Sequence, residues 1–275
     1  MKIGLIGCGR VGITIGYFLR KKHLLYGIYD RNPNTLRNAK NILKIRKNPD
    51  YKNLIQNSDV LLFATPDDEI LNAYKKAQTY LKKEKYLLHF SGLLPAELFP
   101  YKKGIHRGAL HPFATFPKII TPPGRKRYIL FFQGERRCLS IVRKIFSPEN
   151  FIIYPINKKH KPLYHLLGVF SSNLLVALSS AIKFLMKKLN WKEEDFQRII
   201  VPMFMETIHN VTEFGIREGL SGPLVRGDRK TIEKHLSVLK RYPELYDIYV
   251  SLSRILIRYA PMEKQKELKK ILKVN

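Results

Sequence analysis

Short apolar runs alternate with stretches of helical periodicity over the first half of the chain. The runs occupy residues 2–7, 24–30, 59–65, 86–91, 107–112, 128–134 and 151–156. The stretches between them repeat apolar residues every three or four positions, notably after Gly9, after Pro33, over 67–81 and over 135–146. This alternation predicts an α/β fold of Rossmann type, in which helices cover a mostly parallel sheet.

The second half of the chain lacks such runs. Beyond Lys158 the pattern predicts long helices, with breaks near Asn190, Gly219 and Tyr242, over 162–188, 192–217, 228–240 and 243–273. A sheet followed by helices favours two domains. We therefore expect an α/β domain over 1–157 and an all-α domain over 158–275.

A glycine-rich turn joins the first apolar run to the first helix. Gly7, Gly9 and Gly12 have the spacing G-x-G-x-x-G. The first glycine permits a tight turn, the second lets backbone amides approach a pyrophosphate, and the third lets the helix pack closely on the strand. The turn, with Arg10 and Val11, is therefore expected to bind the phosphates of a dinucleotide at the helix N-terminus. Asp30 ends the second run, where a carboxylate binds the adenosine ribose hydroxyls.

Three later runs end in small or polar residues. The third run ends in Ala64, Thr65 and Pro66, which would let the backbone approach the cofactor ribose and nicotinamide. Ser91 and His111 follow at the ends of the next two runs. Because ligands bind at the carboxyl edge of an open α/β sheet, both are candidates for substrate contact. The alternatives are a turn serine and a structural histidine.

Polar residues form a stripe on the first long helix of the second half. His165, Ser172 and Ser179 recur at heptad spacing, and Asn173 lies beside them. The stripe is either an internal hydrogen-bond network or the lining of a cleft that faces the nicotinamide. In the second case His165 would donate the proton in a carbonyl reduction, Asn173 would polarise the carbonyl, and Ser172 would contact the substrate.

Arg226 lies in the turn-rich segment GLSGPLVRGD. The segment is expected to be a loop that precedes a helix capped by Asp228. Arg226 is also a candidate to bind a substrate carboxylate, because its guanidinium suits planar oxyanions.

The composition is strongly basic. Fifty Lys and Arg against 22 Asp and Glu give a net charge of +28 and a pI near 10.1. A nucleic-acid partner is one explanation, but the basic residues are dispersed and form no basic tail. We favour a solvated surface whose field attracts anionic cofactors and substrates. Two distant cysteines make neither a disulfide framework nor a zinc site, so no metal is expected.

Two features bear on location. The first apolar run follows Met1 directly, which leaves no room for a leader and favours the cytoplasm. Residues 162–182 carry no charge and approach the length of a membrane span. Their serines, Asn173 and His165 make a span improbable, so we expect a buried helix of the second domain or of a dimer interface, and no membrane partner.

The motifs together resemble a known family of predicted oxidoreductases that has a Rossmann-like N-terminal domain and a DUF2520 C-terminal domain. The matching segments are GLIGCGRVG, SDVLLFATPDDEI, HFSGLLPAELF, GALHPFATF, YHLLGVFSSNLLVAL and GLSGPLVRGD. The resemblance implies a 6-phosphogluconate-dehydrogenase-like architecture, similar to pyrroline-5-carboxylate reductase and ketopantoate reductase, with a homodimer formed through the helical domain. Some members look like an alternative ketopantoate reductase.

The resemblance also bears on two site residues. Related β-hydroxyacid dehydrogenases carry a catalytic lysine in the corresponding interdomain helix, where this chain has His165 preceded by Lys158, Lys159 and Lys161. Arg31 stands where related enzymes bind the 2′-phosphate of NADP. We expect NADP rather than NAD. The reason is that Asp30 can turn away from the 2′-phosphate, whereas the sequence offers Arg31 few other partners.

These observations favour a cytoplasmic NAD(P)H-dependent reductase of a small anionic carbonyl or imine substrate, with ketopantoate as one candidate. Two other classes stay open. One is a redox sensor that binds NAD(P) without chemistry, and the other is a nucleic-acid-associated protein that uses the net charge of +28.

Overall fold

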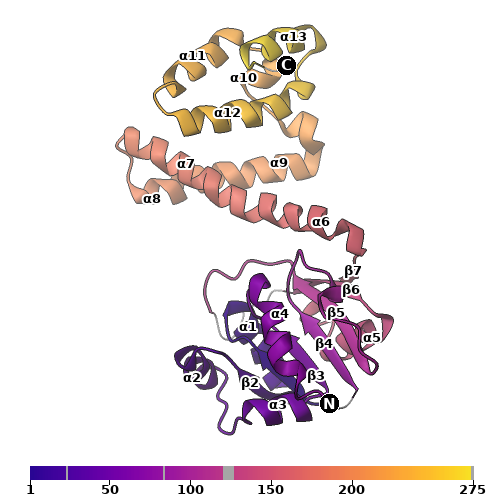
Figure 1. The fold of residues 1–275 in the computed structure, drawn as a ribbon. Helices are drawn as coiled ribbons and strands as arrows, with labels where there is room; N and C mark the ends of the chain where they lie inside the picture. Colours follow the sequence, from indigo (N-terminus) through magenta and orange to yellow (C-terminus); the bar gives the residue numbers. More distant parts are fainter. Residues whose placement is uncertain (23, 83, 120–126, 274–275) are drawn as a thin grey trace. The chain divides into compact units, whose positions relative to one another are not determined.

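The computed structural model describes residues 1–22, 24–82, 84–119 and 127–273, which form two compact units (Figure 1). The first unit is Met1–Leu175 and the second is Val176–Asn275. The first unit therefore includes the helical residues 158–175 as well as the sheet. Each unit is described separately below.

The first unit is built on a seven-stranded sheet with the order β2-β1-β3-β4-β5-β6-β7. Neighbouring strands are parallel except for the antiparallel pair β5 and β6. The chain passes from β1 outward to β2 and returns to β3 on the other side of β1, so the sheet has a topological switch point there. The strands are β1 (Ile3–Ile6), β2 (Leu25–Tyr29), β3 (Val60–Phe63), β4 (Lys85–His89), β5 (Ile105–Pro112), β6 (Tyr128–Gly134) and β7 (Phe151–Pro155).

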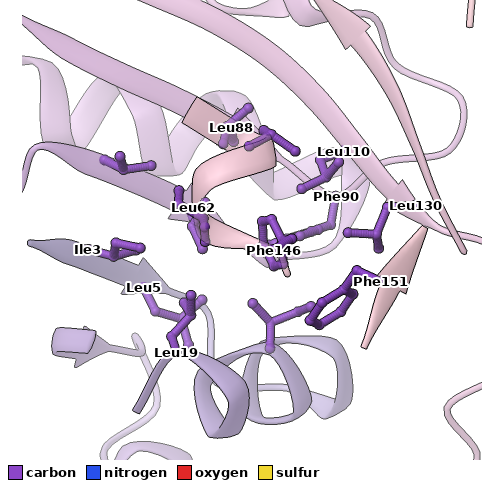
Figure 2. Close-up of a cluster of buried hydrophobic side chains, with 14 of the residues drawn as sticks. Ile3, Leu5, Leu19, Leu62, Leu88, Phe90, Leu110, Leu130, Phe146 and Phe151 are labelled. Carbon is purple, nitrogen blue, oxygen red and sulfur yellow. The ribbon is translucent and has the colours of Figure 1, made fainter. Parts of the chain in front are cut away.

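Both faces of the central strands are buried, which explains why those strands are continuous apolar runs. Ile3 and Leu5 of β1 face one hydrophobic core, which Figure 2 shows, and Ile6 faces the other. The first core is completed by α1 (Arg10–Lys21), α2 (Pro33–Ile42) and α5 (Arg136–Ile145). The second core is completed by α3 (Tyr51–Asn57), α4 (Asp67–Gln78) and the 3-10 turn η1 (Ala96–Leu98). The seven expected strands and the Rossmann-like class are thereby confirmed, whereas the short helix α3 was not anticipated.

A helix at the end of the first unit carries part of the site. After the 3-10 turn η2 (Lys158–His160), α6 (Lys161–Gly168) begins and is followed by the π-helical turn η3 (Val169–Asn173). Lys161 and Tyr164 are buried, although most apolar side chains of α6 are exposed. π-Helical turns are rare and are frequent at functional sites.

The second unit is entirely helical over its described residues. Its core joins α11, α12, η5 and α13 through Ile232, Leu236, Val250, Ile257 and Leu268. The elements are α7 (Leu174–Lys188), α8 (Glu193–Asp195), η4 (Phe196–Ile200), α9 (Val201–Gly219), α10 (Pro223–Arg226), α11 (Arg229–Leu239), α12 (Pro243–Leu256), η5 (Ile257–Tyr259) and α13 (Met262–Ile271).

The single helix expected over 243–273 is wrong. Pro261 stands immediately before α13 and disfavours helical backbone at Ala260, whose ψ is 158°. The chain therefore breaks between η5 and α13.

The uncharged helix of the sequence is not buried within the chain. The helical stretch Lys158–Lys188 is long and apolar enough to cross a membrane, with a mean hydropathy of 1.6 in its most apolar window, of which 6% is buried. Leu163, Leu167 and Phe170 are among its exposed apolar side chains. The expected burial inside the second domain is therefore not observed.

Candidate functional site

The turn after β1 requires glycine at two positions for the packing of the protein itself. Gly7 has φ +97°, and a Cβ there would lie 2.5 Å from the carbonyl oxygen of Ala64. A Cβ on Gly12 would collide with the carbonyl oxygen of Gly7. The two glycines thus permit the tight strand-to-helix turn and the close approach of α1.

Gly9 differs from these two glycines. A Cβ on Gly9 would meet no described protein atom within 4 Å, so packing within the chain does not require glycine there. Gly9 is the N-cap of α1, and no side chain caps this helix. The first amide groups of α1 are therefore free to bind an anion, and no side chain at position 9 blocks its approach.

The other two residues of the turn lie in different surroundings. Arg10 is exposed, and its Nη1 donates to the carbonyl oxygen of Phe116 at 3.3 Å. Val11 is partly buried and packs against the first core.

A cleft of about 320 Å³ continues from this turn along the carboxyl edge of the sheet. Its lining consists of Ile6, Gly7, Gly9, Tyr29, Asp30, Arg31, Thr35, Tyr51, Ala64, Thr65, Pro66, Glu69, Asn72, Ala73 and Lys76. Within the described residues, the buried Oγ1 of Thr65 has no hydrogen-bond partner. A buried hydroxyl without a partner and an unfilled space over Gly9 both fit a bound dinucleotide.

Asp30 and Arg31 are both engaged in the structure. Asp30 accepts hydrogen bonds from the amides of Cys8 at 2.8 Å and Asn32 at 2.9 Å. Arg31 is exposed and forms an ion pair with Glu69 at 2.9 Å. The argument that Asp30 turns away while Arg31 has few partners is therefore wrong. The backbone holds Asp30 in place, and Glu69 competes for Arg31.

Ser91 links the cleft to α6 through a chain of hydrogen bonds that begins at the exposed Asp67 and ends at the buried Lys161. Its Oγ donates to Asp67 Oδ2 at 2.6 Å and accepts from the amide of Leu94 at 2.9 Å. Its carbonyl oxygen accepts from Lys161 Nζ at 3.2 Å. Because Asp67 directly follows Pro66 of the cleft lining, this chain connects the cofactor edge with Lys161.

Lys161 is the most deeply buried cation of the site, with 1% of its surface exposed. Burial lowers the pKa of its ammonium to about 8, while Asp67 and Glu97 act in the opposite direction. The group therefore carries its charge at neutral pH and titrates close to the pH at which an enzyme works.

His111 lies at the end of β5, beside Tyr164 and His165. Its Nδ1 is 2.6 Å from the Tyr164 hydroxyl, and its ring centroid is 5.9 Å from that of His165. Burial, together with the smaller electrostatic effects of nearby His165 and Lys161, lowers the pKa of His111 to about 4. Burial also raises the pKa of the Tyr164 phenol. Both partners are therefore neutral at pH 7.

A pocket of about 430 Å³ opens against this histidine pair. Ser172 and Asn173 of the π-helical turn line it together with His111 and His165, so four predicted residues meet here. The full lining is His111, Phe113, Ala114, Thr115, His165, Gly168, Val169, Ser171, Ser172 and Asn173.

Arg226 lies in the second unit and pairs with a carboxylate of its own loop. Its Nη2 is 2.7 Å from Oδ2 of Asp228. Asp228 is the N-cap residue of α11, but its side chain makes no capping hydrogen bond.

Three residues of this site were not among the predicted ones. The sequence indicates Lys161 only as one of three lysines before His165 and Asp67 only as a residue that opens a helix at the ligand edge, and it predicts no role for Tyr164. Lys161 and His165 are four residues apart on α6, a spacing that places two side chains on one helix face. That spacing was the available signal. In the described residues no group of three His, Cys, Asp or Glu side chains could hold a metal ion.

Comparisons with known proteins identify the two halves of the chain. Residues 2–90 match the family model "NADP oxidoreductase coenzyme F420-dependent", and residues 128–255 match the "Domain of unknown function (DUF2520)". The N-terminal region is therefore similar to NADP oxidoreductases, and the C-terminal region is similar to DUF2520 proteins. The description of the N-terminal family model names NADP and coenzyme F420; NADP is thus supported as the cofactor, and NAD stays open.

Solved structures share the fold of this chain. A proposed NADP oxidoreductase from Bacteroides fragilis is 20% identical, with a TM-score of 0.76 over 93% of this chain and 97% of that one. The pyrroline carboxylate reductase of Plasmodium falciparum, solved with NADP bound, is 13% identical, with a TM-score of 0.60 over 98% and 99%.

A curated relative matches a shorter region. The ketol-acid reductoisomerase (NADP(+)) of Buchnera aphidicola subsp. Diuraphis noxia is 30% identical over 95 residues, which make up 33% of this chain. The match spans 19% of the length of that relative.

Proposed function

We propose that the protein is an NADPH-dependent reductase of a small carbonyl or imine compound that carries a carboxylate. The proposal rests on one arrangement above all. The dinucleotide cleft and the buried Lys161 are joined by the hydrogen-bond chain through Asp67 and Ser91 at one edge of the sheet.

The cofactor would lie in the cleft of the first unit. The amides of the Gly7–Gly12 turn would bind the pyrophosphate, and Thr65 Oγ1 would gain the hydrogen-bond partner that it lacks. NADPH, when bound, supplies a hydride to the substrate. Arg31 would hold the 2′-phosphate once Glu69 gives way.

The substrate would bind in the pocket between β5 and the π-helical turn. His111 would donate a hydrogen bond to the reacting oxygen or nitrogen, and Asn173 and Ser172 would orient the substrate. His165 would supply the proton, as the sequence predicts. The ammonium of Lys161, one helical turn before His165, would stabilise the negative charge that develops there.

The positive charge of the protein favours a substrate that carries a carboxylate. The net charge of +28 raises the local concentration of anions, and buried Lys161 adds a fixed positive charge near the pocket. Ketopantoate meets these requirements and is our first candidate. Pyrroline-5-carboxylate is the imine candidate.

We further propose that the active protein is a cytoplasmic homodimer formed through its helical region. Helix α9 has no buried residue and exposes Met203, Met205, Ile208 and Phe214. Apolar surface of this extent marks an interaction site, and a second copy of the chain would cover it. Sedimentation velocity of the purified protein tests this point, and a monomer at micromolar concentration would contradict it.

The decisive experiment measures cofactor binding and turnover separately. NADPH and NADH are titrated against the purified protein by fluorescence, and NADPH oxidation is then followed with ketopantoate and with pyrroline-5-carboxylate. Binding with oxidation supports the proposal. Binding without oxidation over a broad panel of oxo acids and imines would favour a redox sensor. Absence of binding would contradict the assignment of the cleft.

Gly9 provides a test of the cleft that is independent of turnover. We expect Gly9→Val to lower the unfolding midpoint much less than Gly12→Val does, because a Cβ on Gly9 meets no described protein atom within 4 Å. NADPH affinity should fall by at least about tenfold, because the side chain occupies the phosphate site. Gly12→Val serves as the contrasting variant and should lose stability, because its Cβ collides with Gly7. Unchanged NADPH affinity in Gly9→Val would contradict the proposal.

A further inference from the structure

The hydroxyl of Tyr164 makes one hydrogen bond within the described residues, and this bond is to Nδ1 of His111. The two atoms are 2.6 Å apart. Tyr164 is held in place by aromatic neighbours, with ring centroids 4.4 Å from Phe131 and 5.5 Å from Phe113. Only 5% of its surface is exposed. The contact is therefore short and shielded, and packing fixes the tyrosine ring.

The direction of this hydrogen bond follows from what each atom can offer. The phenol has a single hydrogen and is expected to direct it to the best available acceptor. The unprotonated nitrogen of a neutral imidazole is a strong acceptor, and Nδ1 lies directly in front of the hydroxyl. If Nδ1 donated instead, the phenol hydrogen would have no partner among the described residues, which is costly for a buried group.

We propose that Tyr164 fixes His111 in the tautomer that carries its hydrogen on Nε2, so that His111 meets the substrate as a neutral hydrogen-bond donor. Tyr164 is thus a positioning residue, because it acts through His111. The role toward a substrate rests on the proposed reductase function, whereas the tautomer does not.

The location of Nε2 supports this role. Nε2 and Cε1 of His111 both lie 3.1 Å from the place that a Cβ on Gly92 would occupy, and Cδ2 of His165 lies closer still. A side chain at Gly92 would collide with both imidazoles, so glycine at this position lets the rings of His111 and His165 approach each other beside the pocket that both line. Because Nδ1 contacts Tyr164, Nε2 is the ring nitrogen of His111 whose hydrogen can reach a ligand in this pocket. The opposite tautomer would place a lone pair there and make His111 a base.

His89 supplies an internal reference for the experiment. Its Nδ1 lies 3.2 Å from the amide of Ser91, which can only donate, and its Nε2 lies 3.1 Å from the carbonyl oxygen of Pro95. Backbone groups therefore fix His89 in the Nε2–H tautomer when it is neutral.

The experiment is imidazole ¹⁵N NMR at pH 7, in which protonated and unprotonated ring nitrogens have widely separated shifts. The chain has eight histidines, and His111→Asn and His89→Asn assign the two that matter. In the wild type we expect His111 to show the same pattern as His89, with hydrogen on Nε2. In Tyr164→Phe the His111 shifts should move toward the average of two tautomers, while those of His89 stay unchanged.

The matched control is Tyr154→Phe. Tyr154 stacks on the same Phe131 ring, at 5.6 Å between centroids, and its side chain is about half exposed. This variant should leave both histidines unchanged. A wild-type His111 with hydrogen on Nδ1, or a Tyr164→Phe spectrum like that of the wild type, would overturn the proposal. If Tyr164→Phe fails to fold, the wild-type spectrum still decides the tautomer.

Turnover adds a separate reading once a substrate is known. We expect kcat of Tyr164→Phe to fall by about twofold with little change in KM, because only about half of the molecules would then carry the hydrogen on Nε2. Failure of every substrate would count against the proposed reductase and would leave the NMR result standing. A confirmed reductase with an unchanged kcat in this variant would reject the role of Tyr164.

Discussion

The two ends of strand β5 place a histidine in opposite electrostatic surroundings. At the amino end, His106 lies between two carboxylates, with Nε2 2.7 Å from Glu84 and Nδ1 3.1 Å from Glu135. At the carboxyl end, His111 has a phenol, a second imidazole and a lysine around it. Strand β5 therefore carries two histidines in different surroundings. His106 lies between negatively charged carboxylates, and His111 lies among neutral and positively charged groups.

The carboxylates at the amino end are compensated on every side. Arg107 Nε donates to Glu135 at 2.9 Å, and Arg137 Nη1 lies 3.3 Å from Glu84. The hydrogen bond from His106 lowers the pKa of Glu84. Burial raises the pKa of Glu135, but hydrogen bonds from Arg107 and His106 outweigh this effect and leave the pKa lowered. This end contributes to the stability of the folded chain.

At the carboxyl end, burial instead outweighs the nearby carboxylates, because Asp67 and Glu97 only partly offset its effect on Lys161. The buried ammonium of Lys161 donates to the backbone carbonyl of Ser91, and burial lowers the pKa values of both Lys161 and His111. Burying such groups costs folding free energy. The difference between the two ends indicates that ion pairs maintain the fold at one edge, while the other edge is arranged for chemistry.

Replacement of Lys161 should have the largest effect on activity. We expect Lys161→Met to lower kcat by about 10²–10⁴-fold, because the charge that stabilises the reacting atoms is lost. The stability of this variant at pH 7 should equal or exceed that of the wild type, because a buried charge has been removed. NADPH oxidation and urea unfolding measure the two effects. The exposed Lys159 gives the matched control, and Lys159→Met should change neither. A Lys161→Met variant that loses stability and keeps its kcat would contradict this prediction. It would mean that Lys161 stabilises the fold, as the ion pairs at the amino end of β5 do.

The pH dependence of turnover and that of stability should differ because of Lys161. The pKa of Lys161 is lowered to about 8, so kcat/KM should fall by about tenfold per pH unit once the pH is well above 8. Stability should change in the opposite direction over this range. The unfolded chain binds the Lys161 proton up to its higher, ordinary pKa of 10.5, so stability rises as the pH increases from 8 toward 10.5. Activity that stays constant to pH 10 would exclude the Lys161 charge from the reaction.

The contrast also shows what a sequence reveals. The glycine turn, Asp30 and the seven strands were predicted because each depends on neighbouring residues: a spacing, a strand end or an apolar run. The contacts of Lys161, Tyr164 and Asp67 join segments that are distant in sequence, and their burial depends on how α6 packs on the strand ends. Apart from its four-residue spacing to His165, nothing in the local pattern distinguishes buried Lys161 from exposed Lys158 and Lys159.

Removal of Glu135 should affect stability alone. We expect Glu135→Gln to lower the free energy of unfolding at pH 7 by about 1–2 kcal/mol, because it breaks a partly buried network rather than a single surface pair. Because the pKa of Glu135 is lowered by folding, its contribution is present at neutral pH and is lost as the pH falls through its folded-state pKa. The wild type and the variant should therefore converge in acid. Urea unfolding over a pH series measures this convergence, and kcat should stay at the wild-type value.

The smallest expected effect on stability and binding concerns the ion pair between Arg31 and Glu69. This pair lies at the carboxyl edge of the sheet but is exposed. Such pairs contribute about 0–1 kcal/mol, so Glu69→Gln should leave stability almost unchanged. NADPH affinity should rise by a few-fold, since a 2′-phosphate no longer competes with a carboxylate for Arg31. NADH affinity should stay constant, and Arg31→Ala should lower NADPH affinity and abolish the effect of Glu69→Gln. Parallel fluorescence titrations of both cofactors against the four combinations of these substitutions measure the coupling. Equal changes in the affinities for NADH and NADPH would mean that the ion pair shapes the cleft without selecting the cofactor. Arg31 would then have a structural role, like the ion pairs at the amino end of β5.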